Sequence, residues 1–157
     1  MAKALVVYAT RTRQTQKIGE LIAEGMRMDG LEVTVANVNE IEKKGIKPDD
    51  YNVLVLGSAT YHGEMLQGMK TFLFTLEKAN SAGKVGGAFG AFGWSGEAVR
   101  MIEDRMRGLK MRVPVAGLRI KLIPTDEELD ACRDFGHGLA LALRGEGVER
   151  VIEMADL

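Results

Sequence analysis

Residues 3–16 read KALVVYATRTRQTQ, and this stretch decides the fold class. Its beginning, residues 3–8, is a short apolar run with β-branched side chains, which is typical of a strand buried on both faces. Polar residues follow at 10–16, and apolar residues then recur at helical spacing: Ile18, Leu21, Ile22 and Met26. A buried strand that leads through a polar loop into an amphipathic helix indicates the first unit of a parallel α/β sheet.

The same alternation continues along the chain. Four further strands are predicted, at residues 31–38 (LEVTVANV), 51–56 (YNVLVL), 84–92 (KVGGAFGAF) and within 113–123. Helices are predicted at 65–76, 97–109 and 125–143, and the last of these opens with a capping box formed by Thr125 and Glu128. The pattern predicts an α/β fold, a doubly wound five-stranded parallel sheet with helices on both faces. We expect the strand order 2-1-3-4-5.

Length and composition narrow the class of protein. The 157 residues fit one domain spanning 1–157. A formal net charge of −1 favours neither nucleic acid nor an acidic membrane surface as a partner. Because Cys132 is the only cysteine, an internal disulfide and a cysteine-rich structural metal site are excluded, and a reducing, cytoplasmic setting is expected. The apolar run at the N-terminus is too short for a signal peptide or a membrane span.

Ligands of such sheets bind beyond the carboxyl ends of the strands, where the strand order reverses. Three loops are expected there, at residues 9–16, 58–63 and 91–97. The first brings threonine hydroxyls to a helix start, where backbone N–H groups and the helix dipole favour a phosphate. The other reading is a polar turn with a threonine N-cap.

The second and third loops each combine small residues with one aromatic ring. Tyr61 stands in SATYHGE, and Trp94, the only tryptophan, stands in AFGWSGE. Small residues let the backbone approach a ligand, and aromatic faces stack on planar molecules. A loop tryptophan can also simply cover the edge of the core. Together, one phosphate-type loop and two aromatic loops at one sheet edge favour a planar, phosphorylated ligand.

These motifs resemble the flavodoxin family. TRTRQT (residues 10–15) is similar to the flavodoxin phosphate loop T/S-x-T-G-x-T. GSATYHG (57–63), FGWSGEA (92–98) and PTDEELDACRDFG (124–136) are most similar to the flavodoxin domain of flavodiiron proteins. The resemblance runs from about residue 3 to about residue 143 and implies a short-chain flavodoxin.

The resemblance implies a bound FMN and a set of residues around it. Its phosphate would lie among Thr10, Arg11, Thr12, Arg13, Gln14 and Thr15. The ribityl chain and one ring face would lie against Ser58, Ala59, Thr60 and Tyr61. The same loop continues with His62, where flavodoxins often have glycine, and Gly63. The pyrimidine end or the other ring face would lie against Phe92, Gly93, Trp94 and Gly96. No catalytic residue and no metal ligand is implied.

Three departures from the family pattern stand out. Arg13 replaces the usual glycine of the phosphate loop, which would cost about 1 kcal/mol or more if a positive φ were required. Arg11 and Arg13 either pair with the phosphate or point into solvent. The pI of about 6.2 is high for a flavodoxin, which puts an acidic docking face in doubt. Finally, His62 and His137 are the only histidines, too few for a diiron centre.

Three functions remain open at this point. The first is an FMN-dependent electron carrier that shuttles electrons between redox partner proteins, and we favour it over a stand-alone enzyme. The second is an FMN-dependent oxidoreductase such as a quinone reductase. The third is a flavin-free binding module that keeps the fold. No GxGxxG follows the first strand, so the sequence does not support dinucleotide binding in the Rossmann manner.

Overall fold

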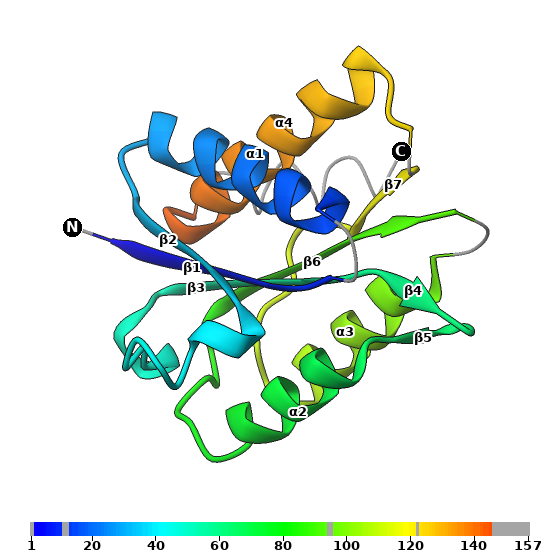
Figure 1. Cartoon of the computed structure of the whole chain (residues 1–157). Coiled ribbons are helices and arrows are strands. Elements are labelled where there is room, and N and C mark those ends of the chain that lie inside the picture. Colours follow the sequence, from blue (N-terminus) through cyan, green and yellow to red (C-terminus); the bar gives the residue numbers. More distant parts are fainter. Residues whose placement is uncertain (1, 11–12, 94–95, 122, 146–157) are drawn as a thin grey trace.

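A parallel five-stranded sheet forms the centre of the computed structural model, which describes residues 2–10, 13–93, 96–121 and 123–145. The strand order is β2-β1-β3-β6-β7 (Figure 1). The strands are β1 (Lys3–Ala9), β2 (Glu32–Asn37), β3 (Val53–Ser58), β6 (Val85–Phe92) and β7 (Leu118–Lys121). Counted along the chain within this sheet, the order is 2-1-3-4-5, so the predicted fold is confirmed.

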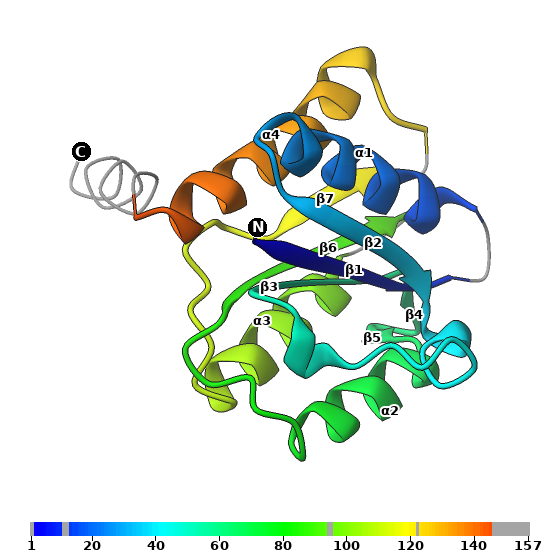
Figure 2. The same ribbon diagram turned by 90° about the vertical axis from the view of Figure 1, so that its left-hand side faces the viewer.

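Helices cover both faces of the sheet, as predicted. Helices α1 (Gln14–Met28) and α4 (Asp126–Leu143) pack on one face, and α2 (Gln67–Leu76) and α3 (Glu97–Gly108) pack on the other (Figures 1 and 2). Each face buries its own apolar cluster, because β1 and β3 alternate their side chains between the two. The connection after β2 contains two single-turn 3₁₀ helices, Val38–Glu40 and Pro48–Asp50.

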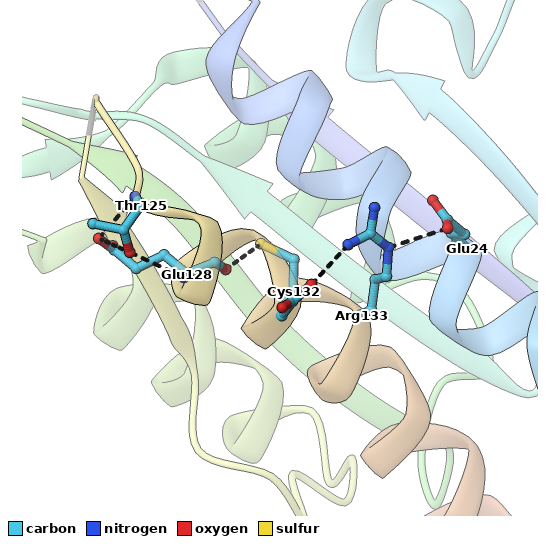
Figure 3. Close-up of polar contacts among 6 residues, drawn as sticks. Glu24, Thr125, Glu128, Cys132 and Arg133 are labelled. Carbon is cyan, nitrogen blue, oxygen red and sulfur yellow. Dashed lines mark hydrogen bonds and ion pairs between the residues drawn. The ribbon is translucent and has the colours of Figure 1, made fainter.

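Two glycines let α1 and α4 approach until their backbones touch. A Cβ atom on Gly136 would lie 2.1 Å from the carbonyl oxygen of Ile22, and one on Gly25 would lie 2.1 Å from that of Arg133. Real Cβ atoms do not approach so closely, so only glycine fits at either position. Beside this crossing, the guanidinium of Arg133 donates to Glu24 at 3.1 Å (Figure 3). The two helices therefore form a close and specific contact.

Helix α4 begins with the predicted capping box. The hydroxyl of Thr125 accepts a hydrogen bond from the Glu128 N–H at 3.2 Å, and the Glu128 carboxylate accepts one from the Thr125 N–H at 3.4 Å (Figure 3). One turn later, Cys132 is fully buried and its thiol donates to the Glu128 carbonyl oxygen at 3.3 Å. Burial raises the pKa of the Cys132 thiol to about 11, so this cysteine is protonated at neutral pH and acts as a packing residue.

The structure corrects the sequence prediction at the start of the second helix. Met65, predicted to begin a helix, lies in a short strand β5 (Glu64–Met65) that pairs with β4 (Thr60–Tyr61) as a separate hairpin. The fifth strand, expected within 113–123, is β7, where Leu118–Lys121 pairs with β6. Ahead of it, Gly117 donates its N–H to the Glu103 carboxylate at 2.9 Å. No helix in the described ranges is long and apolar enough to cross a membrane.

Candidate functional site

Three loops leave the carboxyl ends of neighbouring strands, and we call this region the loop edge. In the sheet, Ala9 of β1 pairs with Ser58 of β3, and Gly57 of β3 pairs with Phe89 of β6. From these strands the chain enters α1, the β4–β5 hairpin and α3. The start of α1, the hairpin and the end of β6 lie at one side of the sheet (Figure 1). The topology thus gathers the three loops that the sequence singles out.

The first loop ends at Arg13, the N-cap residue of α1. Arg13 is exposed, and its φ of −79° and ψ of −2° lie in the right-handed region. The arginine at the usual glycine position therefore carries no left-handed strain. Its side chain makes no capping hydrogen bond, and the first turn of α1 holds no acidic residue. The N–H groups of this turn have no acceptor within the helix, and no carboxylate of the first turn itself lies at the positive end of its dipole.

Thr15 lies in that first turn and is fully buried. Its hydroxyl oxygen has no hydrogen-bond partner among the residues that the structure describes. Such a group costs about 1–3 kcal/mol when it stays unsatisfied, so a buried unpaired hydroxyl points to a ligand. Thr10, at the beginning of the same loop, is half-buried. Arg11 and Thr12 lie outside the described residues.

In the second loop, the hydroxyls of Ser58 and Thr60 form hydrogen bonds within the protein. Ser58 is fully buried; its hydroxyl donates to the Ala59 carbonyl at 2.8 Å and accepts from the Leu66 N–H at 2.9 Å. The Thr60 hydroxyl accepts a hydrogen bond from the Ala98 N–H at 3.1 Å. Sequence reasoning assigned both residues to the lining of a cofactor site, whereas these contacts give each hydroxyl a role in the protein itself.

The tip of the second loop is a two-residue turn between β4 and β5. His62 has a φ of 52° and Gly63 a φ of 74°, and both signs are those that a type I′ turn requires. The Tyr61 side chain is 49% exposed, and its ring centroid lies 4.2 Å from that of His62 at an interplanar angle of 70°. A half-exposed aromatic ring is thereby presented on a short, regular hairpin.

The third loop connects β6 with α3. Phe92 ends the strand half-buried, Gly93 is exposed, and Gly96 is the N-cap residue of α3. Trp94 lies outside the described residues. From the edge strand β7, the guanidinium of Arg119 donates its Nε–H to the Gly96 carbonyl oxygen at 3.2 Å. The third loop is therefore held at its far end by a residue that sequence reasoning did not select.

The described members of the predicted site thus lie on three adjacent loops, and two hydrogen bonds link these segments. The Ala59 N–H donates to the Ala9 carbonyl at 3.4 Å, which joins the first two loops. The Thr60–Ala98 bond joins the second to the first turn of α3, directly after the third. Whether each residue touches a cofactor stays a prediction. The sequence did not predict a role for Arg119, because a whole helix separates this residue from the third loop and no sequence signal marks the pairing.

Comparison with known proteins identifies the fold and the family. The flavodoxin family model matches residues 6–136. The type A flavoprotein fprA of Rhodobacter capsulatus is 35% identical over 98% of this chain, which covers 36% of that protein. The nitric oxide reductase of Moorella thermoacetica is 28% identical over 88% of this chain, again covering 36% of the relative. This chain therefore spans about a third of the length of these curated relatives.

Solved structures agree with this result. A flavodoxin from the domain Archaea superposes with a TM-score of 0.84 at 34% identity, over 90% of this chain and 99% of that one. The Flv1 flavodiiron core from Synechocystis gives a TM-score of 0.85 at 29% identity, over 92% of this chain and 36% of the other. The predicted resemblance to flavodoxins and to flavodiiron proteins is confirmed. With its topology, its loop edge and these matches, the chain belongs to the flavodoxin family.

Proposed function

We propose that this chain binds one FMN at the loop edge and carries electrons between redox partner proteins. The observation that carries the proposal is the buried hydroxyl of Thr15, which lacks a partner among the described residues and lies at the start of α1. Family membership supports the same ligand, since flavodoxins typically bind FMN. A reducing, cytoplasmic location fits a chain whose single thiol is buried.

The residues present at the start of α1 fit a phosphate group. A phosphate offers acceptor oxygens, and the Thr15 hydroxyl and the first-turn N–H groups are donors. The first turn brings no carboxylate that would repel an anion. Arg13 is exposed at the N-cap and adds positive charge at the rim. Thr10 and Thr15 would therefore hold the phosphate by hydroxyl groups, and Arg13 would attract it from the surface.

The second and third loops would hold the planar part of the cofactor. When bound, FMN supplies the redox chemistry, because its ring system accepts and releases one or two electrons. Tyr61 offers a half-exposed ring at one side, and Trp94 belongs to the loop at the other. The Ser58 proton is already donated to Ala59, so this residue would offer the ribityl chain its backbone groups and one remaining acceptor lone pair of its hydroxyl.

The phosphate assignment is tested by comparing FMN with riboflavin, which lacks the phosphate. We expect FMN to bind more tightly, with both affinities measured by quenching of flavin fluorescence. Thr15→Val should weaken the binding of FMN by about 10- to 150-fold, which corresponds to one hydrogen bond to a charged group. The affinity for riboflavin should not change. Thr15→Ser should retain most of the preference.

A matched control is Thr71→Val, because Thr71 is exposed on α2 and its hydroxyl bonds only within that helix. This variant should bind both flavins like the wild type. Equal wild-type affinities for FMN and riboflavin would overturn the phosphate site at the start of α1.

Electron transfer is tested on the FMN-loaded protein. A carrier should accept electrons from dithionite and pass them to an added one-electron acceptor such as cytochrome c. It should not oxidise NAD(P)H by itself, with or without a quinone. Sustained NAD(P)H oxidation coupled to quinone reduction would show an enzyme instead of a carrier. Failure to bind any flavin would leave the third function, a flavin-free module.

A further inference from the structure

The first turn of α3 is fixed by two residues from other parts of the chain. Thr60, on the hairpin, accepts the Ala98 N–H at 3.1 Å. Arg119, on the edge strand β7, donates to the Gly96 carbonyl at 3.2 Å. Helix α3 makes no side-chain capping bond of its own, because its N-cap residue is Gly96. The hydroxyl of Thr60 therefore supplies, from a separate hairpin, the acceptor that an N-cap serine or threonine normally provides.

The surroundings of this turn leave little freedom for other arrangements. Ala98 is fully buried, so its N–H has no access to water as an alternative acceptor. A Cβ atom on Gly96 would lie 2.9 Å from Cδ of Arg119, which shows that the arginine stem lies directly over the turn. Thr60 itself is half-buried and precedes the half-exposed Tyr61. Both residues act on the place where the loop that contains Trp94 enters α3.

We propose that Thr60 and Arg119 are positioning residues, which fix the third loop relative to the hairpin and to the edge of the sheet. They couple the hairpin that carries Tyr61 to Gly96 and the first turn of α3, where the third loop ends. The consequence for flavin binding rests on the proposed function; the consequence for loop order does not. In this assignment Thr60 acts through the backbone of Ala98 and not through a contact with the cofactor.

Thr60→Val and Thr60→Ser form the decisive pair. Valine keeps the shape and removes the acceptor, whereas serine keeps the acceptor. The first readout is the fluorescence of Trp94 in the flavin-free protein, where this residue is the only tryptophan. We expect Thr60→Val to change the emission maximum or the acrylamide quenching constant, and Thr60→Ser to restore the wild-type values. Thr75→Val, whose lost hydroxyl bonds only within α2, is the matched control and should match the wild type.

The second readout is affinity for two flavins. Thr60→Val should lower the affinities for FMN and for riboflavin by the same factor, about three- to tenfold, which corresponds to one neutral hydrogen bond. The FMN-to-riboflavin ratio should not change, because the phosphate loop is untouched. Arg119→Met should act in the same direction on both readouts, and Arg119→Lys should restore part of the loss.

Three outcomes would overturn the assignment. Wild-type Trp94 emission and quenching in Thr60→Val would show that Thr60 does not fix the loop. Identical behaviour of the valine and serine variants would show that the hydroxyl is irrelevant. A changed FMN-to-riboflavin ratio would show a direct contact between Thr60 and the cofactor. If the wild type bound no flavin, the proposed function would fail, yet the emission of Trp94 would still decide the coupling.

Discussion

The contact between α1 and α4 and the loop edge are built in opposite ways. At the helix contact, glycines bring backbone against backbone, and Gly136 leaves no room for even one methyl group. At the loop edge, by contrast, the buried hydroxyl of Thr15 lacks a partner among the described residues, Tyr61 is half-exposed, and His62 adopts a positive φ. The helix contact is closed by tight backbone packing, whereas the loop edge keeps groups and conformations that a ligand could use.

The comparison shows where this fold can tolerate unfavourable local features. An unpaired hydroxyl and a left-handed histidine each cost on the order of 1–3 kcal/mol, a sizeable part of a typical folding free energy of about 5–15 kcal/mol. They persist because the surrounding sheet and helices fix the chain on both sides of each loop. The α1–α4 contact contributes to this support, since α1 carries Thr15 in its first turn and is held by α4 further along, at Ile22 and Gly25.

The largest effect is expected at the helix contact. Gly136→Ala places a methyl group 2.1 Å from the Ile22 carbonyl oxygen, and rotation of a side chain cannot relieve a clash with backbone. We expect a loss of about 3 kcal/mol in the free energy of unfolding, at the upper end of overpacking costs. Urea unfolding followed by circular dichroism measures this loss.

The same helix offers a matched control for that prediction. A Cβ atom on Gly138 would meet Val115 at 3.5 Å, an ordinary van der Waals distance. Gly138→Ala should therefore be neutral or stabilise the protein by up to about 1 kcal/mol, through helix propensity. Similar unfolding free energies for the two alanine variants would show that α1 and α4 are not in backbone contact.

A smaller effect is expected at the loop edge, and it should appear in binding instead of stability. Trp94→Ala should weaken the binding of FMN by about 1 kcal/mol, the size of an aromatic stacking energy. The free energy of unfolding should stay nearly unchanged. Tyr61→Ala should have a similar or smaller effect on FMN. Phe74→Ala is the control, because Phe74 is an aromatic residue 57% exposed on α2. Wild-type affinity in both loop variants would refute stacking by either ring.

The fold was predictable because each of its signals is local. Apolar runs, helical spacing and the Thr125–Glu128 capping box act over a few residues and are visible in any window of sequence. The position of the three loops also followed, because the carboxyl ends of parallel strands must lie at one edge. The motif resemblance extended this result to a family, which the comparisons confirmed.

The parts that escaped prediction depend on contacts between distant segments. Arg119 reaches Gly96 across a whole helix, and Thr60 reaches Ala98 across 38 positions. Met65 has the spacing of a helix residue, yet pairing with Thr60 places it in a hairpin. The positive φ suspected at Arg13 is absent there, while His62 adopts one, because the two-residue turn demands it. Such outcomes are set by tertiary structure and leave no periodic signal.

The smallest effect is expected at the turn itself, where two opposing contributions nearly cancel. Asn-Gly is the preferred pair for a type I′ turn, since asparagine tolerates positive φ better than histidine does. His62→Asn should therefore relieve part of the strain at φ 52°. The substitution also removes the ring contact with Tyr61, which is worth little because Tyr61 is half-exposed. We expect a net gain of about 0.5 kcal/mol in the free energy of unfolding, by urea unfolding.

His62→Gly separates the two contributions, because glycine adopts positive φ freely but increases the entropy of the unfolded chain. It should lie close to the wild type in stability, below His62→Asn. If His62→Asn is the most stable of the three proteins, and His62→Gly and the wild type are about equally stable below it, backbone strain outweighs the ring contact. If both variants were less stable than the wild type by more than about 0.5 kcal/mol, the Tyr61–His62 contact would be the larger contribution. The loop edge would then resemble the helix contact in relying on specific packing, and the contrast between the two regions would rest on Thr15 alone.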